Sequence, residues 1–133
     1  TVTLALSCVG PKPQDGPPNP HTSKAFLVYV NPVGEKTMSE WDVTSYPVGT
    51  VIVKEKYDRE ALGGKPFERV DPAKLKNAKP ELLTIMVKGK NGWQYLAADG
   101  KGKLQKGDTS YCRSCHEMVQ KQDYVFRPYV YSR

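Results

Sequence analysis

The sequence predicts a mainly β domain of the α+β class, in which an antiparallel sheet carries a few short helices and one helix lies near the C-terminus. Segments rich in β-branched and aromatic residues indicate four strands, over residues 24–31, 50–57, 82–88 and 93–97. Asn91-Gly92, between the last two segments, is typical of a tight hairpin turn. At 133 residues the chain is long enough for one domain and too short for two ordinary ones.

The segment over 50–57 follows a turn at 47–49, and its successive side chains are expected to alternate between two faces. If it is a strand, its even-numbered residues share one face, and its odd-numbered residues share the other. Ile52, Lys54 and Lys56 therefore lie side by side on the predicted strand. This places two lysines next to an apolar residue.

Two short helices are predicted before the C-terminal part. The first covers 37–43, with Thr37 as its N-cap and Glu40 in the capping-box position. The second starts at Asp71-Pro72, because a capping residue followed by proline is typical of a helix start.

The C-terminal part is expected to hold one longer helix and a last strand. Asp108 or Thr109 caps a helix that runs to about Gln122. The segment 124–131 is expected to be a closing strand.

The N-terminal residues 1–20 are interpreted as an arm, and the domain is expected to cover 21–133. Residues 10–20 contain five prolines and two glycines without an apolar period, which is typical of an extended linker. The apolar start that ends at Cys8 has two interpretations. It is either the remnant of an export signal with Cys8 as a lipid-anchor cysteine, or an N-terminal strand with an idle thiol.

Charge and cysteine content exclude several classes of protein. The formal charge is +6, from 20 Lys and Arg against 14 Asp and Glu, and the basic residues are scattered. This pattern does not indicate a nucleic-acid partner, and it suits the docking of an acidic redox partner. No run approaches the ~18 apolar residues of a membrane-spanning helix. Three cysteines, two of them in one motif, exclude a disulfide scaffold.

The motif that carries chemistry is Cys112-Arg113-Ser114-Cys115-His116, the C-x-x-C-H signature of c-type haem attachment. Two residues between the cysteines separate the thiols enough to reach the two vinyl groups of one porphyrin. The adjacent imidazole can then bind the iron. The sequence thus predicts one haem c, attached through Cys112 and Cys115, with His116 as an iron ligand.

Two alternatives to haem remain open. A zinc site would need Cys8 and His21 to join Cys112 and Cys115, across the proline-rich arm. A thiol–disulfide motif would prefer a strand-to-helix setting of the thioredoxin type.

The second axial position of the iron has four candidate ligands: His21, Met38, Met86 and Met118. Met86 lies in an apolar strand, where core packing is the simpler explanation, and Met118 follows His116 on the same helix and cannot reach the opposite haem face. We therefore expect an open or water-filled site. The alternative is a six-coordinate haem in an electron-transfer cytochrome.

The order of the motifs resembles the cytochrome P-460 family, which includes the related cytochromes c′-beta. The resemblance spans about 21–131 and rests on a C-x-x-C-H near the C-terminus, followed by Asp123-Tyr124-Val125-Phe126, and on upstream runs at 28–32, 46–55 and 84–88. It implies a mostly antiparallel β fold, a periplasmic homodimer, and a five-coordinate haem with His116 as the proximal ligand.

The resemblance also assigns a role to Lys54. In the family's hydroxylamine-oxidising enzymes, a lysine is bonded to a porphyrin meso carbon, and Lys54 occupies the matching position. A lysine beside an apolar haem edge loses its proton more readily, and the neutral amine is a nucleophile. The alternative is a solvated lysine on a strand of a basic protein.

Tyr111 departs from the pattern of those enzymes. They carry a glutamate immediately before the first haem cysteine, as a proton relay. A phenol is a poor base at neutral pH, so the change disfavours turnover. It favours the cytochrome c′-beta type, whose apolar distal pocket binds nitric oxide.

Phe26, Tyr46 and Phe67 are candidates for lining such a pocket, with Tyr46 preferred because it begins the run that carries Lys54. Ordinary core packing is the alternative for each. The combined expectation is a periplasmic mono-haem c protein that binds nitric oxide or converts small nitrogen oxides such as hydroxylamine.

Overall fold

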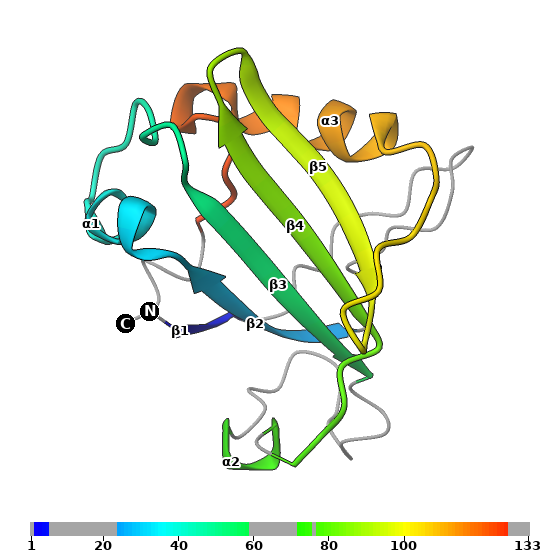
Figure 1. Ribbon diagram of the computed structural model, residues 1–133. Coiled ribbons are helices and arrows are strands. Elements are labelled where there is room, and N and C mark those ends of the chain that lie inside the picture. Colours follow the sequence, from blue (N-terminus) through cyan, green and yellow to red (C-terminus); the bar gives the residue numbers. More distant parts are fainter. Residues whose placement is uncertain (1, 6–23, 59–71, 76, 128–133) are drawn as a thin grey trace.

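The computed structural model describes residues 2–5, 24–58, 72–75 and 77–127. Within these ranges the chain forms one antiparallel sheet whose strands follow each other in sequence order (Figure 1). The strands are β1 (Val2–Ala5), β2 (Lys24–Val30), β3 (Val51–Asp58), β4 (Leu82–Gly89) and β5 (Gly92–Asp99). The helices are α1 (Pro32–Ser39), α2 (Pro72–Leu75), α3 (Ser110–His116) and the 3-10 helix η1 (Glu117–Gln122). The predicted fold class is confirmed.

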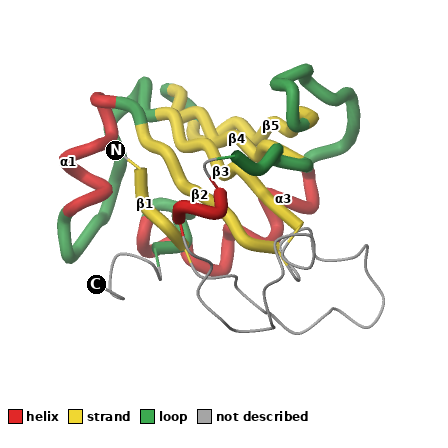
Figure 2. Tube along the Cα trace, turned by 90° about the horizontal axis from the view of Figure 1, so that it is seen from below, coloured by secondary structure: helices red, strands yellow, loops and turns green. Residues whose placement is uncertain are grey.

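The helices that follow β5 cover one face of the sheet. In Figure 1, α3 and η1 pass behind the sheet near the β4–β5 turn, and Figure 2 shows α3 on one side of the strands. Strand pairing places Val28, Lys54 and Thr84 in one row across the sheet, and Val30, Ile52, Met86 and Tyr95 in the next. The main buried cluster contains Val28 and the second of these rows. The face toward α3 is therefore the core face.

The predicted β4–β5 hairpin is confirmed. Gly89 pairs with Gly92, so Lys90 and Asn91 form the two-residue turn. Gly92 has φ +115, a value that residues with a side chain rarely adopt. The glycine of the Asn91-Gly92 signal thus sits at the first position of β5.

The first helix differs from its prediction over 37–43. It runs from Pro32 to Ser39, so Thr37 lies in its last turn and Glu40 is the residue that ends it. Pro32 at the first helical position has its φ fixed near the helical value, and this preference outweighed the apparent capping box. The Asn31 side chain joins this helix start to β3, since it donates to the carbonyl of Gly49 and accepts from the amide of Val51.

The C-terminal part also differs from its prediction. The α-helix ends at His116 and continues as η1, with a kink at Val119. Asp123 and Tyr124 then have φ values of +52 and +63, which are incompatible with a strand. The expected closing strand is absent over residues 124–127, and the rest of it lies outside the described residues. At the helix start, the Asp108 carboxylate accepts hydrogen bonds from the amide and hydroxyl of Ser110.

Arg127 fixes the end of this segment to α1. Its guanidinium is buried and donates to the carbonyls of Met38 and Glu40 at the C-terminal end of that helix. The segment that follows η1 is thereby tied to an element from the first third of the chain.

Several predictions fall outside the described residues. These include Cys8, His21, Phe67 and the expected boundary between arm and domain near residue 21. The second short helix is found at Pro72–Leu75. None of the described helices is long and apolar enough to cross a membrane.

Gly34 offers a test of the packing between α1 and β3. A Cβ at this buried helical position would collide with the side chains of Thr50 and Val30. We expect Gly34→Ala to lower the free energy of unfolding by about 1–3 kcal/mol, through overpacking. Chemical denaturation measures this, with Lys36→Ala on the exposed side of the same helix as the control. A Gly34→Ala variant that is as stable as the native protein contradicts the close approach, because alanine favours an unobstructed helix.

Candidate haem site

A cavity lies between α3 and the core face of the sheet. It has an empty volume of about 530 Å³, part of it open to solvent. The lining residues come from β3, β4, β5 and α3, and they are Ile52, Lys54, Thr84, Ile85, Met86, Tyr95, Leu96, Tyr111, Cys112, Cys115 and His116. Five candidate site residues from the sequence, Lys54, Tyr111, Cys112, Cys115 and His116, thus meet at one cavity.

Cys112 and Cys115 reach the cavity from one turn of α3. Residues three apart lie on the same face of a helix, so both thiols line the same wall. Both cysteines are half-buried and free. They therefore meet the geometric requirement for holding one edge of a planar cofactor from a single helix.

His116 is buried at the end of α3 and held on three sides. Its Nδ1 lies 2.6 Å from the carbonyl oxygen of Tyr124, and a carbonyl can only accept. The ring centroids of Tyr95 and Phe126 lie 5.2 Å and 5.1 Å from that of the imidazole. Nδ1 must then carry the proton of the neutral ring, and Nε2 keeps the lone pair that a metal needs.

The surroundings of His116 favour the neutral imidazole. Burial, together with the hydrogen bond to Tyr124 that opposes it and the charges of Lys54 and Lys56 that add to it, lowers the pKa of His116 to about 4. A neutral imidazole is the form that binds iron. The site thus presents an unprotonated Nε2 at neutral pH.

Lys54 lies at the centre of the sheet, paired with Val28 on one side and Thr84 on the other. The alternation predicted for this strand holds, since Ile52 and Lys54 both line the cavity and Lys56 is fully buried. Lys54 and His116 both line this space, and the charge of Lys54 lowers the pKa of the imidazole.

The family comparison agrees with this geometry. The family model of Cytochrome P460 matches residues 12–127, which is most of the chain. The chain belongs to the cytochrome P460 family. No curated protein matches it. As a member of the cytochrome P460 family it is a haem c protein of a family associated with nitrogen compounds.

The residues present fit the haem that the cytochrome P460 family implies. The cavity joins two thiols on one helix turn, a neutral histidine with its Nε2 free of the Tyr124 hydrogen bond, and an apolar wall. Among the described residues, no group of three or more His, Cys, Asp and Glu side chains could hold a metal ion by itself. Cys8 and His21, which the zinc alternative requires, lie outside the described ranges.

Tyr46 and Phe26 were expected to line the distal pocket of this cytochrome P460 chain. Tyr46 is buried in the core with its ring edge against Trp93, and its hydroxyl lies 3.5 Å from the sulfur of Met38. It is not among the residues that line the cavity. Phe26 belongs to β2, where it pairs with Lys56, and its side chain lies outside what the structure describes.

The three methionines that are candidate sixth ligands of the iron lie in different parts of the structure. Met86 is buried and lines the cavity, Met38 contacts Tyr46, and Met118 is 79% exposed. Met86 is therefore the methionine that the described part of the chain places at the site.

Sequence reasoning missed two parts of the site. Tyr95 forms part of the wall, and burial raises its pKa to about 12, so its hydroxyl stays protonated. The alternation of Trp93 and Tyr95 along β5 was a signal that could have found it. Asp123 was noted only as part of a family run, yet it anchors the turn that delivers the Tyr124 carbonyl to His116. No local pattern reveals that role.

Proposed function

We propose that the chain carries one haem through Cys112 and Cys115, with His116 on one side of the iron and an open position on the other. It binds nitric oxide there, or converts a small nitrogen oxide such as hydroxylamine. The observation that carries this proposal is the meeting of the C-x-x-C-H residues and Lys54 at one cavity. When bound, the haem supplies a redox-active iron with an exchangeable coordination site.

The protein's own residues prepare this site before any ligand enters. The Tyr124 carbonyl fixes the tautomer and direction of the His116 ring, and the Tyr95 and Phe126 rings limit its rotation. A fixed imidazole reduces the reorganisation that coordination requires. This is the usual effect of a partner in the outer shell of a metal ligand.

The walls of the cavity suit a weakly polar ligand. Ile52 and Met86 on the core face supply carbon and sulfur surface, and the polar groups of the cavity are the hydroxyls of Thr84, Tyr95 and Tyr111 and the amine of Lys54. Nitric oxide binds haem iron without the polar stabilisation that bound oxygen needs, so it suits the apolar part of this wall.

Lys54 is proposed to bond to a porphyrin meso carbon, as its counterpart does in the hydroxylamine-oxidising members of the family. The C–N bond would replace one amine N–H and the meso C–H, and an added two-electron oxidant such as hydrogen peroxide would take up the two electrons and two protons and leave as water. Its place on the cavity wall and its position in a central strand support this. Pairing with a strand on each side fixes the backbone of Lys54, so its side chain starts from a fixed point on the cavity wall.

Tyr111 bears on the choice between binding and turnover. It lines the cavity one residue before Cys112, where the hydroxylamine-oxidising relatives carry glutamate. Hydroxylamine oxidation releases protons along with electrons, and no described carboxylate lines this cavity. Nitric oxide binding needs no base, so we favour it.

The second candidate is a six-coordinate electron carrier, and one observation favours it. Met86 is a buried thioether at the cavity wall, and thioether ligation of haem raises the reduction potential. A ferrous absorption spectrum with low-spin bands that do not change when carbon monoxide is added would support this alternative.

The family resemblance and the charge of the chain extend the proposal. We propose a periplasmic homodimer, with the net charge of +6 available for docking an acidic redox partner. A lipid anchor at Cys8 remains part of this proposal. Half-buried apolar side chains such as Val53 and Leu83 lie on the sheet face away from α3 and support a second copy as one partner.

Intact-mass spectrometry and an absorption spectrum test the haem assignment. We expect one covalent haem per chain and a high-spin ferrous form that binds carbon monoxide and nitric oxide. Cys112→Ala combined with Cys115→Ala should abolish covalent attachment, because no thioether remains. Ser114→Ala, at the exposed position inside the same motif, is the matched control and should keep the haem. A colourless matured protein would refute the proposal.

Peptide mapping tests the Lys54 bond. Trypsin cleaves after Arg113, so the haem is expected to join one peptide that contains Cys112 and another that contains Cys115. If the Lys54 bond forms, we expect a third peptide joined through Lys54, and a strongly red-shifted ferrous Soret band. Lys54→Arg removes the primary amine and should eliminate both signals. Lys103→Arg, on the exposed loop after β5, should change neither. A native haem that joins only the Cys112 and Cys115 peptides shows that the Lys54 bond does not form.

Turnover of hydroxylamine with an added oxidant tests the role of Tyr111. We expect slow consumption by the native protein and an increase in Tyr111→Glu of up to about 10²–10⁴-fold, the usual contribution of a positioned base. Tyr111→Phe reports whether the hydroxyl itself takes part. Rapid turnover by the native protein would instead assign it to the hydroxylamine-oxidising enzymes.

A further inference from the structure

Asp123 is a buried carboxylate directly after η1, and it accepts hydrogen bonds from two distant parts of the fold. Its oxygens lie 2.8 Å and 2.7 Å from Nζ of Lys88, and one of them lies 2.7 Å from the amide nitrogen of Tyr46. Its main-chain carbonyl accepts from the indole nitrogen of Trp93 at 2.8 Å. Asp123 is 6% exposed, so these bonds are shielded from water.

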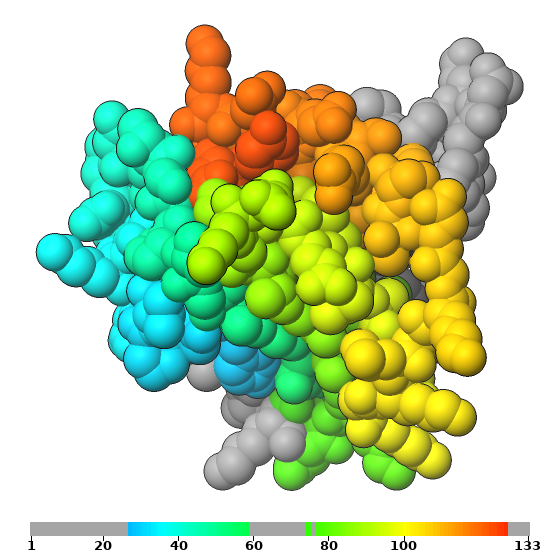
Figure 3. Space-filling model, turned by 45° about the horizontal axis from the view of Figure 1, so that its top comes forward, coloured from blue at the N-terminus to red at the C-terminus, as the bar shows by residue number. Residues whose placement is uncertain are grey.

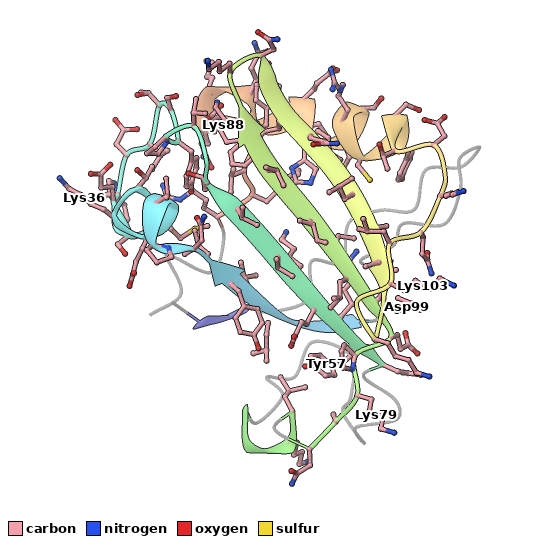
Figure 4. The ribbon with its side chains drawn as sticks, in the orientation of Figure 1. Lys36, Tyr57, Lys79, Lys88, Asp99 and Lys103 are labelled. Atoms are coloured by element: carbon pink, nitrogen blue, oxygen red, sulfur yellow. The ribbon has the colours of Figure 1, made fainter. Side chains whose placement is uncertain are left out.

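These contacts join Asp123 to the β4–β5 hairpin and to the loop before β3. Lys88 comes from the end of β4, and Figure 4 labels it close to the segment that follows α3. Its ammonium group also lies 5.3 Å from the centre of the Trp93 ring. In the space-filling view, the β4–β5 hairpin packs directly beside the residues that follow α3 (Figure 3).

The backbone conformation at Asp123 determines the direction of the Tyr124 carbonyl. Asp123 and Tyr124 both adopt positive φ values, and this turn reverses the chain after η1. The carbonyl of Tyr124 then points back to Nδ1 of His116, and Phe126 places its ring against the same imidazole. The geometry of the turn therefore determines the length and direction of the hydrogen bond to His116.

We infer that the Asp123–Lys88 pair is a positioning device for the proximal histidine, which fixes the Tyr124 carbonyl on Nδ1 of His116 and so sets the strength of the bond between Nε2 and the iron. This inference rests on the proposed haem function. A strong hydrogen bond at Nδ1 makes the imidazole a better donor, since outer-shell partners raise ligand basicity. A loosened turn weakens that hydrogen bond and the iron–histidine bond together.

The experiment uses the haem-loaded protein and the variants Asp123→Asn and Lys88→Met. The Asp123→Asn change keeps the size and the tolerance of positive φ but removes the charge and one acceptor. The Lys88→Met change removes the ammonium group and keeps an unbranched apolar stem. Resonance Raman of the ferrous form measures the iron–histidine stretch, and redox titration measures the reduction potential.

We expect both variants to lower the frequency of the iron–histidine stretch and to raise the reduction potential. Lys88→Arg, which keeps the charge, should restore most of the native frequency. Asp108→Asn is the matched control, because the Asp108 carboxylate accepts hydrogen bonds from Ser110 at the opposite, exposed end of α3. It should leave frequency and potential unchanged.

A purely structural role would give a different result. In that case Asp123→Asn and Lys88→Met lower the melting temperature while the iron–histidine frequency stays native, and the inference is overturned. If Asp123→Asn does not fold, Lys88→Met and Lys88→Arg decide the question by the same comparison.

A second measurement separates this inference from the proposed function. Proton–nitrogen NMR of the carbon monoxide-bound ferrous protein reads the His116 tautomer, and only two histidines need to be assigned. Were no haem attached, the proposed function would fail, and the same NMR on the haem-free chain would still test the hydrogen bond. We expect a strongly deshielded Nδ1 proton that moves upfield in Asp123→Asn. No change in that proton refutes the inference in either form of the protein.

Discussion

The hydrogen bond between His116 and the Tyr124 carbonyl is the interaction on which the site depends. At 2.6 Å it determines which nitrogen of the buried ring carries the proton. Without it the imidazole has two tautomers, and in one of them Nε2 cannot bind a metal. The residues that fold around this contact come from β5, from the end of α3 and from the segment after η1.

This hydrogen bond has a conformational cost. Two successive residues with a side chain occupy the left-handed region, at roughly 1–2 kcal/mol for each. Hydrogen bonds to charged groups contribute about 1.5–3 kcal/mol each, and the Asp123 carboxylate makes several of them in a buried setting. The strain at the turn is therefore of a size that its local contacts can offset. Local strain that is held by surrounding structure is common where a functional group must point in one direction.

The elements whose signals are local were predictable. Strand periodicity located β2 to β5, the Asn91-Gly92 pair located the hairpin, and the C-x-x-C-H motif located both thiols and His116. The first helix was misplaced because an apparent capping box competed with a proline at the first helical position. Alternation along β3 correctly placed Lys54 beside Ile52, since a period of two is fixed by backbone geometry. The prediction of a closing strand was wrong because no local sequence pattern near residue 124 indicates the distant hydrogen-bond partners of Asp123. These partners lie in β4 and in the loop before β3.

The cavity also bears on the order in which the protein matures. Its thiols and histidine lie within five consecutive residues of one helix, whereas its opposite wall needs three paired strands from the middle of the chain. Under the proposed attachment, a porphyrin could be tethered to this short motif before the sheet forms, because all three attachment residues lie on one helix. Once tethered, it brings a large apolar surface to the sheet face that holds Ile52 and Met86. Burial of that surface would then help drive the sheet and α3 together, and the prosthetic group becomes a part of the hydrophobic core.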